Sequence, residues 1–237
     1  MSDEDKKKIF GASHAELPKL NSLNEVKKVI AVMSGKGGVG KSSVTSLLAT
    51  TLKREGKKVG ILDADITGPS IPKLFNLPAG GLRKSEQGLL PAVTGTGIKV
   101  MSTNLLVPNE DDAVIWRGPM IGNMIQQFWR DTLWGKLDVL LVDMPPGTSD
   151  AAITVAQSLP LNGVVLVTSP QMLAGMVVKK ASAMLIQLNV PVLAVVAGIG
   201  LPKAALDSAL FLPGDLLKAL AAALIVAGVP KLRPPPA

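Results

Sequence analysis

The chain has 237 residues, 47% hydrophobic and 18% charged, so it can bury the core of an α/β domain and is too apolar to be disordered. It contains no cysteine, which excludes disulfides, thiolate metal sites and a cysteine-held Fe–S cluster in these residues. The net charge of +7 favours anionic partners, but the lysines are scattered without interleaved aromatic residues, so we do not expect nucleic-acid binding.

Neither a secretory signal nor a membrane span is predicted. The first ten residues carry acidic and basic side chains and no apolar stretch. The longest apolar run, near residues 216–229, is interrupted by Lys218 and is too short to cross a bilayer. We therefore expect a cytoplasmic protein that does not act on membranes.

The first chemical motif follows an apolar, β-branched run over residues 29–33, which predicts a buried strand. A glycine-rich turn comes next, and a helical pattern begins at about Lys41. Between strand and helix the sequence fits G-x-x-x-x-G-K-[ST], the phosphate-binding loop in its required setting. The predicted nucleotide-binding residues here are Gly35, Lys36, Gly37, Gly38, Val39, Gly40, Lys41, Ser42 and Ser43.

The residue types of this loop suit ATP with Mg²⁺. Glycines let main-chain N–H groups close around phosphate oxygens, and the start of the helix adds partial positive charge. Lys41 is predicted to reach the β- and γ-phosphates, and the Ser42 hydroxyl to bind Mg²⁺. The alternative, a glycine-rich turn with a chance lysine, does not account for the full motif between a strand and a helix.

Lys36 is a second lysine that an ordinary phosphate loop does not need. The form K-G-G-x-G-K-S resembles the deviant Walker A loop of a family that contains partitioning ATPases, nitrogenase iron protein and the Mrp/ApbC/Nbp35 iron–sulfur carriers. In that family the extra lysine crosses a dimer interface to the partner subunit's nucleotide. The resemblance implies this catalytic role for Lys36 and a homodimer with nucleotide at its interface; the alternative is a solvated loop lysine.

Two carboxylates follow the next strand. The helix is predicted over residues 41–55 and the strand over 58–62, which places Asp63 and Asp65 at the strand's carboxyl end, where parallel sheets bind ligands. Asp65 is the candidate for orienting water or holding the metal, with Asp63 in support. A capped strand-end turn is the alternative. Residues 68–72 are predicted to be a mobile switch segment without regular structure.

The middle of the chain is expected to contribute core rather than chemistry. Residues 78–97 are rich in glycine and proline and predict a hairpin or excursion loop, followed by a short strand at 98–102. An amphipathic helix is predicted from Trp116 to about Trp134, with an apolar stripe around Met124 and Phe128 that fits core or dimer contact.

The second nucleotide motif lies within residues 137–147, LDVLLVDMPPG. An apolar strand ends in Asp143, as a Walker B carboxylate must if it is to reach Mg²⁺ directly or through water. Gly147 follows two prolines, and its amide is predicted to sense the γ-phosphate. The predicted magnesium ligands are therefore Ser42, Asp65 and Asp143, and the predicted activity is slow, Mg-dependent ATP hydrolysis.

The last elements complete the predicted fold. Strands are expected at 163–168 and 190–197, with a helix over 171–188 between them. Repeated alternation of strands and helices predicts one doubly wound, mainly parallel α/β sheet with helices on both faces. Residues 1–24 are expected to be a flexible arm, and residues 25–237 one nucleotide-binding domain with an atypical C-terminal portion of about forty residues.

Taken together the motifs resemble one branch of the family, Mrp/ApbC/Nbp35, over roughly residues 28–196. They are SGKGGVGKSSVT, DADITGPSIPKLF, WRGPM, LDVLLVDMPPGTSDAAITVAQ and GVVLVTSPQ. Partitioning ATPases share the phosphate loop but lack the other motifs in combination. The resemblance implies ATP bound between two subunits and a transferable Fe–S cluster that is delivered to apoproteins.

The chain departs from that branch near its C-terminus. Gly198-Ile199 stand where the family has an Asn-Met pair that helps to read adenine, and residues 201–211 lack the cluster-binding C-x-x-C pair. Three hypotheses follow: an ATPase of the cluster-carrier family, with or without a cluster; a partitioning-type ATPase acting as a nucleotide-dependent dimerisation switch; and a nucleotide-binding structural protein without turnover.

Overall fold

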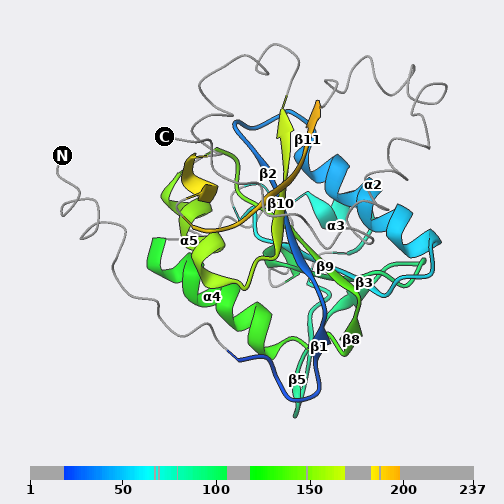
Figure 1. The fold of residues 1–237 in the computed structure, drawn as a ribbon. Helices are drawn as coiled ribbons and strands as arrows, with labels where there is room; N and C mark the ends of the chain where they lie inside the picture. Colours follow the sequence, from blue (N-terminus) through cyan, green and yellow to red (C-terminus); the bar gives the residue numbers. More distant parts are fainter. Residues whose placement is uncertain are drawn as a thin grey trace.

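The chain folds around one predominantly parallel β-sheet (Figure 1). The computed structural model describes residues 19–66, 68, 70–78, 80–105, 118–147, 149–168, 183–186 and 188–197. Within them the main sheet has seven strands in the order β11-β10-β2-β9-β3-β7-β6. Every neighbouring pair is parallel except β6 with β7, which confirms the predicted α/β sheet.

The main-sheet strands are β2 (Val29–Ser34), β3 (Val59–Asp63), β6 (Ala92–Val93), β7 (Lys99–Ser102), β9 (Val139–Asp143), β10 (Gly163–Thr168) and β11 (Val192–Ala197). Two short additional sheets pair β1 (Glu25–Val26) with β8 (Lys136–Leu137), and β4 (Arg83–Ser85) with β5 (Gly88–Leu90). The helices are α2 (Lys41–Arg54), α3 (Ile71–Leu74), α4 (Gly118–Asp131), α5 (Asp150–Ser158) and a 3₁₀ turn at Thr103–Leu105.

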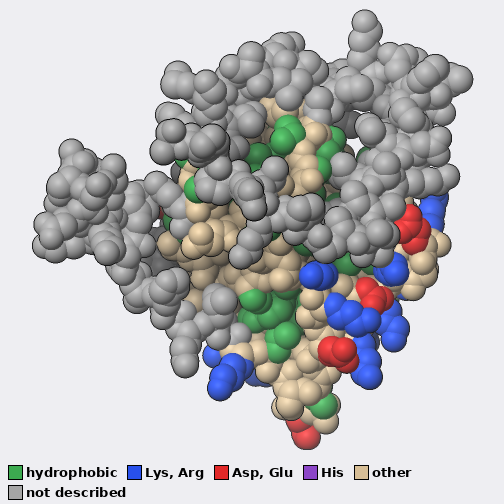
Figure 2. All heavy atoms as spheres, in the orientation of Figure 1, with side chains coloured by type: hydrophobic (Ala, Val, Ile, Leu, Met, Phe, Trp, Pro, Cys, Tyr) green, Lys and Arg blue, Asp and Glu red, His purple; other side chains and the backbone are tan. Residues whose placement is uncertain are grey.

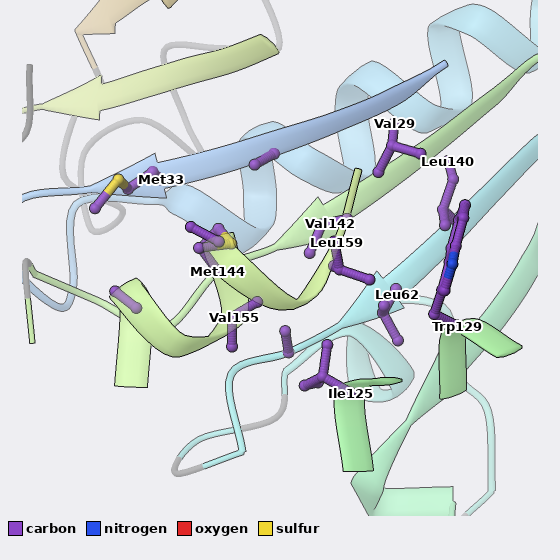
Figure 3. Close-up of a cluster of buried hydrophobic side chains, with 14 of the residues drawn as sticks. Val29, Met33, Leu62, Ile125, Trp129, Leu140, Val142, Met144, Val155 and Leu159 are labelled. Atoms are coloured by element: carbon purple, nitrogen blue, oxygen red, sulfur yellow. The ribbon is translucent and has the colours of Figure 1, made fainter. Parts of the chain in front are cut away.

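Helices cover both faces of the sheet, as the doubly wound prediction requires. Alternate residues of a strand point to opposite faces, so each central strand contributes to two cores. On the face of α2 and α3, Ile61 packs in a cluster with Leu48 and Ile71. On the face of α4 and α5, Leu62 joins the other cluster, with Ile125 and Val155 (Figure 3).

Within the described residues the main predicted elements agree with the structure to within a few residues, and one prediction is wrong. Helix α2 ends at Arg54, one residue before its predicted end and two before Gly56, whose φ of 82° terminates it. The hairpin expected within 78–97 is the antiparallel pair β4–β5. The prediction that residues 68–72 have no regular structure is wrong at its end, because Ile71 and Pro72 begin α3; proline is tolerated in a first helical turn, where its missing N–H has no intrahelical partner.

Helix α4 contributes to the core, which is one of the two roles that the sequence predicts for it. Helix α4 spans Gly118–Asp131 of the described residues, so it ends before the predicted limit of about Trp134, and Met124 and Phe128 on it are buried in the cluster that faces α5. Trp134 lies beyond the helix and is also buried.

The end of the expected N-terminal arm is attached to the domain. Asn24 Nδ2 donates to Thr132 O at 2.7 Å, and Asn24 Oδ1 accepts from Gly135 N at 2.8 Å. Asn21 Nδ2 reaches Gln87 O at 3.1 Å. The rest of the arm, most of the helix expected over 171–188, and the atypical segment after residue 197 lie outside the described residues.

Candidate nucleotide site

The site is built where neighbouring strands end in register. Asp143 at the end of β9 is opposite Val32 of β2 on one side and Asp63 of β3 on the other. Asp63 is in turn opposite Ser102, the last residue of β7. Parallel strands end at the same edge, so this register brings together side chains far apart in sequence.

The phosphate loop runs from the end of β2 to the start of α2. Gly38 and Gly40 have φ values of 76° and 90°, in the left-handed region that favours glycine. Val39 between them is buried against Val32 and Val167, which anchors the loop to the sheet. The loop therefore has the strand–turn–helix setting that the sequence predicts, with α2 beginning at Lys41.

The Lys41 ammonium lies between two of the predicted carboxylates. Its Nζ is 2.8 Å from Asp143 Oδ2 and 3.4 Å from Asp65 Oδ2. Ser42 Oγ donates to the same Asp143 Oδ2 at 2.6 Å. Lys41 and Asp143 are 7% and 0% exposed, so this is a buried ion pair rather than a solvated one. The structure thus brings Lys41, Ser42, Asp65 and Asp143 into one constellation.

Thr45, one helical turn after Lys41, is a site residue that the sequence reasoning missed. Its Oγ1 is 2.8 Å from Asp143 Oδ1 and the residue is fully buried. Thr45 lies on the buried face of α2 together with Leu48, Ala49 and Leu52, and a polar residue on that face, four residues after the loop lysine, was the available signal.

Asp63 is more central than its supporting role suggested. Its Oδ2 accepts from Ser102 Oγ at 3.1 Å and from Ile71 N at 3.4 Å, and its Oδ1 accepts from Asp65 N at 3.3 Å. One buried carboxylate thus holds both ends of the segment between Asp65 and α3. Burial, and then Asp143 on the adjacent strand, raise the pKa of Asp63 well above its ordinary value, against the opposing effect of Lys41.

The raised pKa of Asp63 makes a prediction about stability. A carboxyl group whose pKa is higher in the folded state than in the unfolded state contributes to the stability of the fold. That contribution is fully present below the unfolded-state pKa of about 3.9, and it is lost as the pH rises through the folded-state pKa. Asp63→Asn should remove that loss. We expect the free energy of unfolding of Asp63→Asn to increase steadily relative to that of the parent, so that the variant gains in relative stability, as pH rises from about 4 toward neutrality.

Urea unfolding at a series of pH values, on protein freed of nucleotide, measures this difference. Asp150→Asn, which removes an exposed carboxylate, is the matched control for loss of a carboxyl group. A parallel pH dependence in Asp63→Asn and the parent would contradict the prediction.

Three other predicted residues lie around this constellation without joining it. Lys36 is exposed in the loop and makes no ion pair within the described part of the chain. Ser43 is half-buried in the first turn of α2. The Gly147 amide donates to Ser34 O at 2.8 Å, so here it braces the strand that leads into the loop. Their predicted roles toward the nucleotide remain predictions.

The oxygen donors of the site fit a magnesium ion. Mg²⁺ is commonly held by one or two carboxylates together with substrate phosphates and water, and Ser42, Asp65 and Asp143 offer a hydroxyl and two carboxylates. No group of three or more His, Cys, Asp or Glu side chains suited to a metal ion occurs among the described residues. The arrangement therefore suits a metal that arrives with a phosphate ligand rather than an all-protein cage.

The charged surface elsewhere is of mixed sign. Figure 2 shows Lys and Arg side chains gathered at the lower right of the molecule, with Asp and Glu among them. Asp138, just before β9, pairs with Lys27 Nζ at 2.8 Å and accepts from Lys58 N at 2.9 Å, and the pKa of Asp138 is lowered mainly by its hydrogen bond with Lys27.

In the part of the chain that the structure describes, no helix has the length and apolarity to traverse a membrane.

A lysine at the start of a helix, behind a glycine loop and against a strand-end aspartate, defines a P-loop NTPase. The model of one such family, described as ParA, NUBPL iron-transfer P-loop NTPase, matches residues 25–211. The chain belongs to this family of iron-transfer P-loop NTPases. This confirms the resemblance and favours the cluster-carrier hypothesis over the partitioning one.

Its relatives carry matching names. The iron-sulfur cluster carrier protein of Clostridium perfringens is 48% identical over 194 residues, 78% of this chain and 68% of that protein. The protein of the same name from Methanocaldococcus jannaschii is 43% identical over 81% of this chain and 66% of its own length. The cytosolic Fe-S cluster assembly factor CFD1 of Yarrowia lipolytica is 45% identical over 74% of this chain and 62% of its own length. The match thus spans about two thirds of these relatives.

Solved structures agree. A nucleotide-binding protein from Archaeoglobus fulgidus, in complex with ADP, is 42% identical, with a TM-score of 0.66 over 84% of this chain and 87% of that one. Cobyrinic acid a,c-diamide synthase from Mycobacterium smegmatis, at 14% identity and a TM-score of 0.56 over 85% and 94% of the two chains, shares the fold alone.

Proposed function

We propose that this chain binds Mg-ATP and hydrolyses it slowly, as the dimerising nucleotide switch of an iron–sulfur cluster carrier. The observation that carries the proposal is the Lys41 ammonium, buried between Asp143 and Asp65 at the start of α2. Phosphate oxygens are anionic acceptors like these carboxylates, so ATP competes for the same ammonium. The ADP complex of the related A. fulgidus protein supports the choice of an adenine nucleotide, and the names of the relatives support the role of a cluster carrier.

Each residue then has a distinct task. Lys41 turns to the β- and γ-phosphates and the loop amides surround them. Ser42 and Asp143 would hold Mg²⁺, which when bound neutralises charge that develops on the phosphates. Asp65, released from Lys41, is the acceptor that orients the attacking water. Since the site is largely buried, these charges act at a lower effective dielectric than in water.

The amino-acid composition limits what can be proposed about the iron–sulfur cluster. The relatives are named as carriers of iron–sulfur clusters, so apoproteins that receive clusters are the proposed clients. These 237 residues contain no cysteine, and therefore provide no thiolate ligand for a cluster. The proposal accordingly concerns the nucleotide cycle and includes no cluster-transfer step.

Asp65→Ala and Asp143→Ala test the assignment of the carboxylates. Each variant should retain some ATP binding, because Lys41 and the loop amides remain, but turnover should fall by about 10²-fold or more. Binding of a fluorescent ATP analogue and release of phosphate measure the two effects separately. Asp138→Ala, at the opposite end of β9, is the matched control. If Asp143→Ala hydrolyses ATP as fast as the parent, Asp143 is not part of the catalytic site.

A further inference from the structure

The carboxylate of Asp143 has a different set of partners on each oxygen. Oδ2 faces Lys41 Nζ at 2.8 Å and Ser42 Oγ at 2.6 Å. Oδ1 accepts from Thr45 Oγ1 at 2.8 Å. All of these partners come from the first two turns of α2, and Asp143 itself is fully buried.

The Thr45 hydroxyl has two acceptors within reach and a single proton. The other is Lys41 O at 3.1 Å, the carbonyl four residues earlier in the helix. A threonine within a helix often donates to that carbonyl. Here the carboxylate oxygen is nearer and charged, and a charge-assisted hydrogen bond is the stronger one. The proton is therefore assigned to Asp143 Oδ1.

Nucleotide binding would draw some of these partners away from Asp143. On the proposed function, Lys41 is drawn to phosphate oxygens and Ser42 to Mg²⁺, so both partners of Oδ2 are needed elsewhere. Thr45 lies deeper in the helix, is fully buried, and has no part in the phosphate loop. Its bond to Oδ1 is the side-chain contact of Asp143 that this exchange leaves intact.

We infer that Thr45 is a positioning residue for magnesium: by holding Oδ1 of Asp143, it keeps Oδ2 directed to the metal when Lys41 and Ser42 turn to the nucleotide. The inference rests on the proposed Mg-ATP binding and adds a residue outside the phosphate loop. Hydrogen bonds to a metal-ligating carboxylate fix its orientation, and their loss typically costs about 10- to 100-fold in metal affinity.

Thr45→Val tests the inference, because valine keeps the shape and approximate volume of this buried side chain and replaces the hydroxyl with a methyl group. Calorimetry would measure the affinity for a slowly hydrolysed ATP analogue, first with EDTA and then across a Mg²⁺ titration. We expect the affinity of Thr45→Val for the analogue without Mg²⁺ to stay within about twofold of that of the parent. The Mg²⁺ concentration that produces half of the Mg²⁺-dependent change in affinity should rise about tenfold or more. Thr45→Ser, which retains the hydroxyl, should restore the parent value.

Two further variants separate the hydroxyl from packing. Thr50→Val removes a hydroxyl from the same helix that donates only to Ser46 O, at 2.8 Å, and should leave the Mg²⁺ dependence unchanged. If Thr45→Val does not fold, Thr45→Ser and Thr45→Ala form the comparison, because both lack the methyl group and differ in the hydroxyl alone.

The outcomes distinguish the inference from the proposal on which it rests. A parent-like Mg²⁺ dependence in Thr45→Val, or an equal loss in the serine and alanine variants, overturns the role of Thr45 and leaves Mg-ATP binding standing. A parent protein whose affinity for the analogue does not respond to Mg²⁺ overturns both. A loss in valine and alanine that serine restores supports the inference.

Discussion

Lys41→Ala should abolish ATP binding and also destabilise the folded protein. The first effect follows from removing the cation nearest the β- and γ-phosphates. The second follows from the structure, because Asp143 is fully buried and would lose its ion-pair partner. Removing one member of a buried pair typically costs about 3–5 kcal/mol, since the remaining charge stays desolvated.

The two effects can be separated by a second change. In Lys41→Ala/Asp143→Asn the unpaired charge is gone, so urea unfolding should show much of the lost stability recovered, while calorimetry should still detect no ATP binding. Arg54→Ala, an exposed cation at the end of the same helix, is the control for loss of positive charge. Parent-like ATP affinity in Lys41→Ala would show that the loop is not a nucleotide site.

Lys36→Ala should leave ATP bound and remove ATP-dependent dimerisation. Lys36 is exposed, and within the described residues it has no ion-pair partner, so its charge is available to a neighbouring subunit. In the proposed two-fold dimer each subunit would supply one such lysine to the other's nucleotide. A charge-assisted contact is worth about 1.5–3 kcal/mol, so two of them shift association by several powers of ten.

Sedimentation of Lys36→Ala and the parent with a slowly hydrolysed ATP analogue, and then with ADP, tests this expectation. The parent should dimerise with the analogue and less with ADP, which lacks the γ-phosphate. Lys28→Ala is the matched control, since Lys28 is an exposed lysine that precedes β2, at the opposite end of the strand from the loop. If Lys36→Ala dimerises as well as the parent, Lys36 is a surface lysine and the proposed switch fails.

The phosphate loop and the main strands were predictable because their signals are local. A strand, a glycine turn and a helix are contiguous over residues 29–54, and the backbone angles at Gly38 and Gly40 explain why those positions are glycine. Strand β10 was predicted with its observed bounds, since an unbroken run of apolar residues buried on both faces has few other readings. The start of α3 was missed because proline usually signals a break, and only its position in a first turn makes it compatible with a helix.

The sequence by itself determined the class of the protein and the chemistry of its loop, because each motif is local: the glycines, Lys41 and Ser42 lie within one loop, and Asp143 ends one apolar strand. Tertiary structure decided how these groups meet. Thr45 and Asp143 are 98 residues apart, and Asp63 and Ser102 are 39 apart. Their contacts depend on the order and register of the strands, which no local pattern encodes, and on how α2 packs against the sheet. The partition of Asp143 between Thr45 on one oxygen and Lys41 with Ser42 on the other requires both that register and the packing of α2 against the sheet.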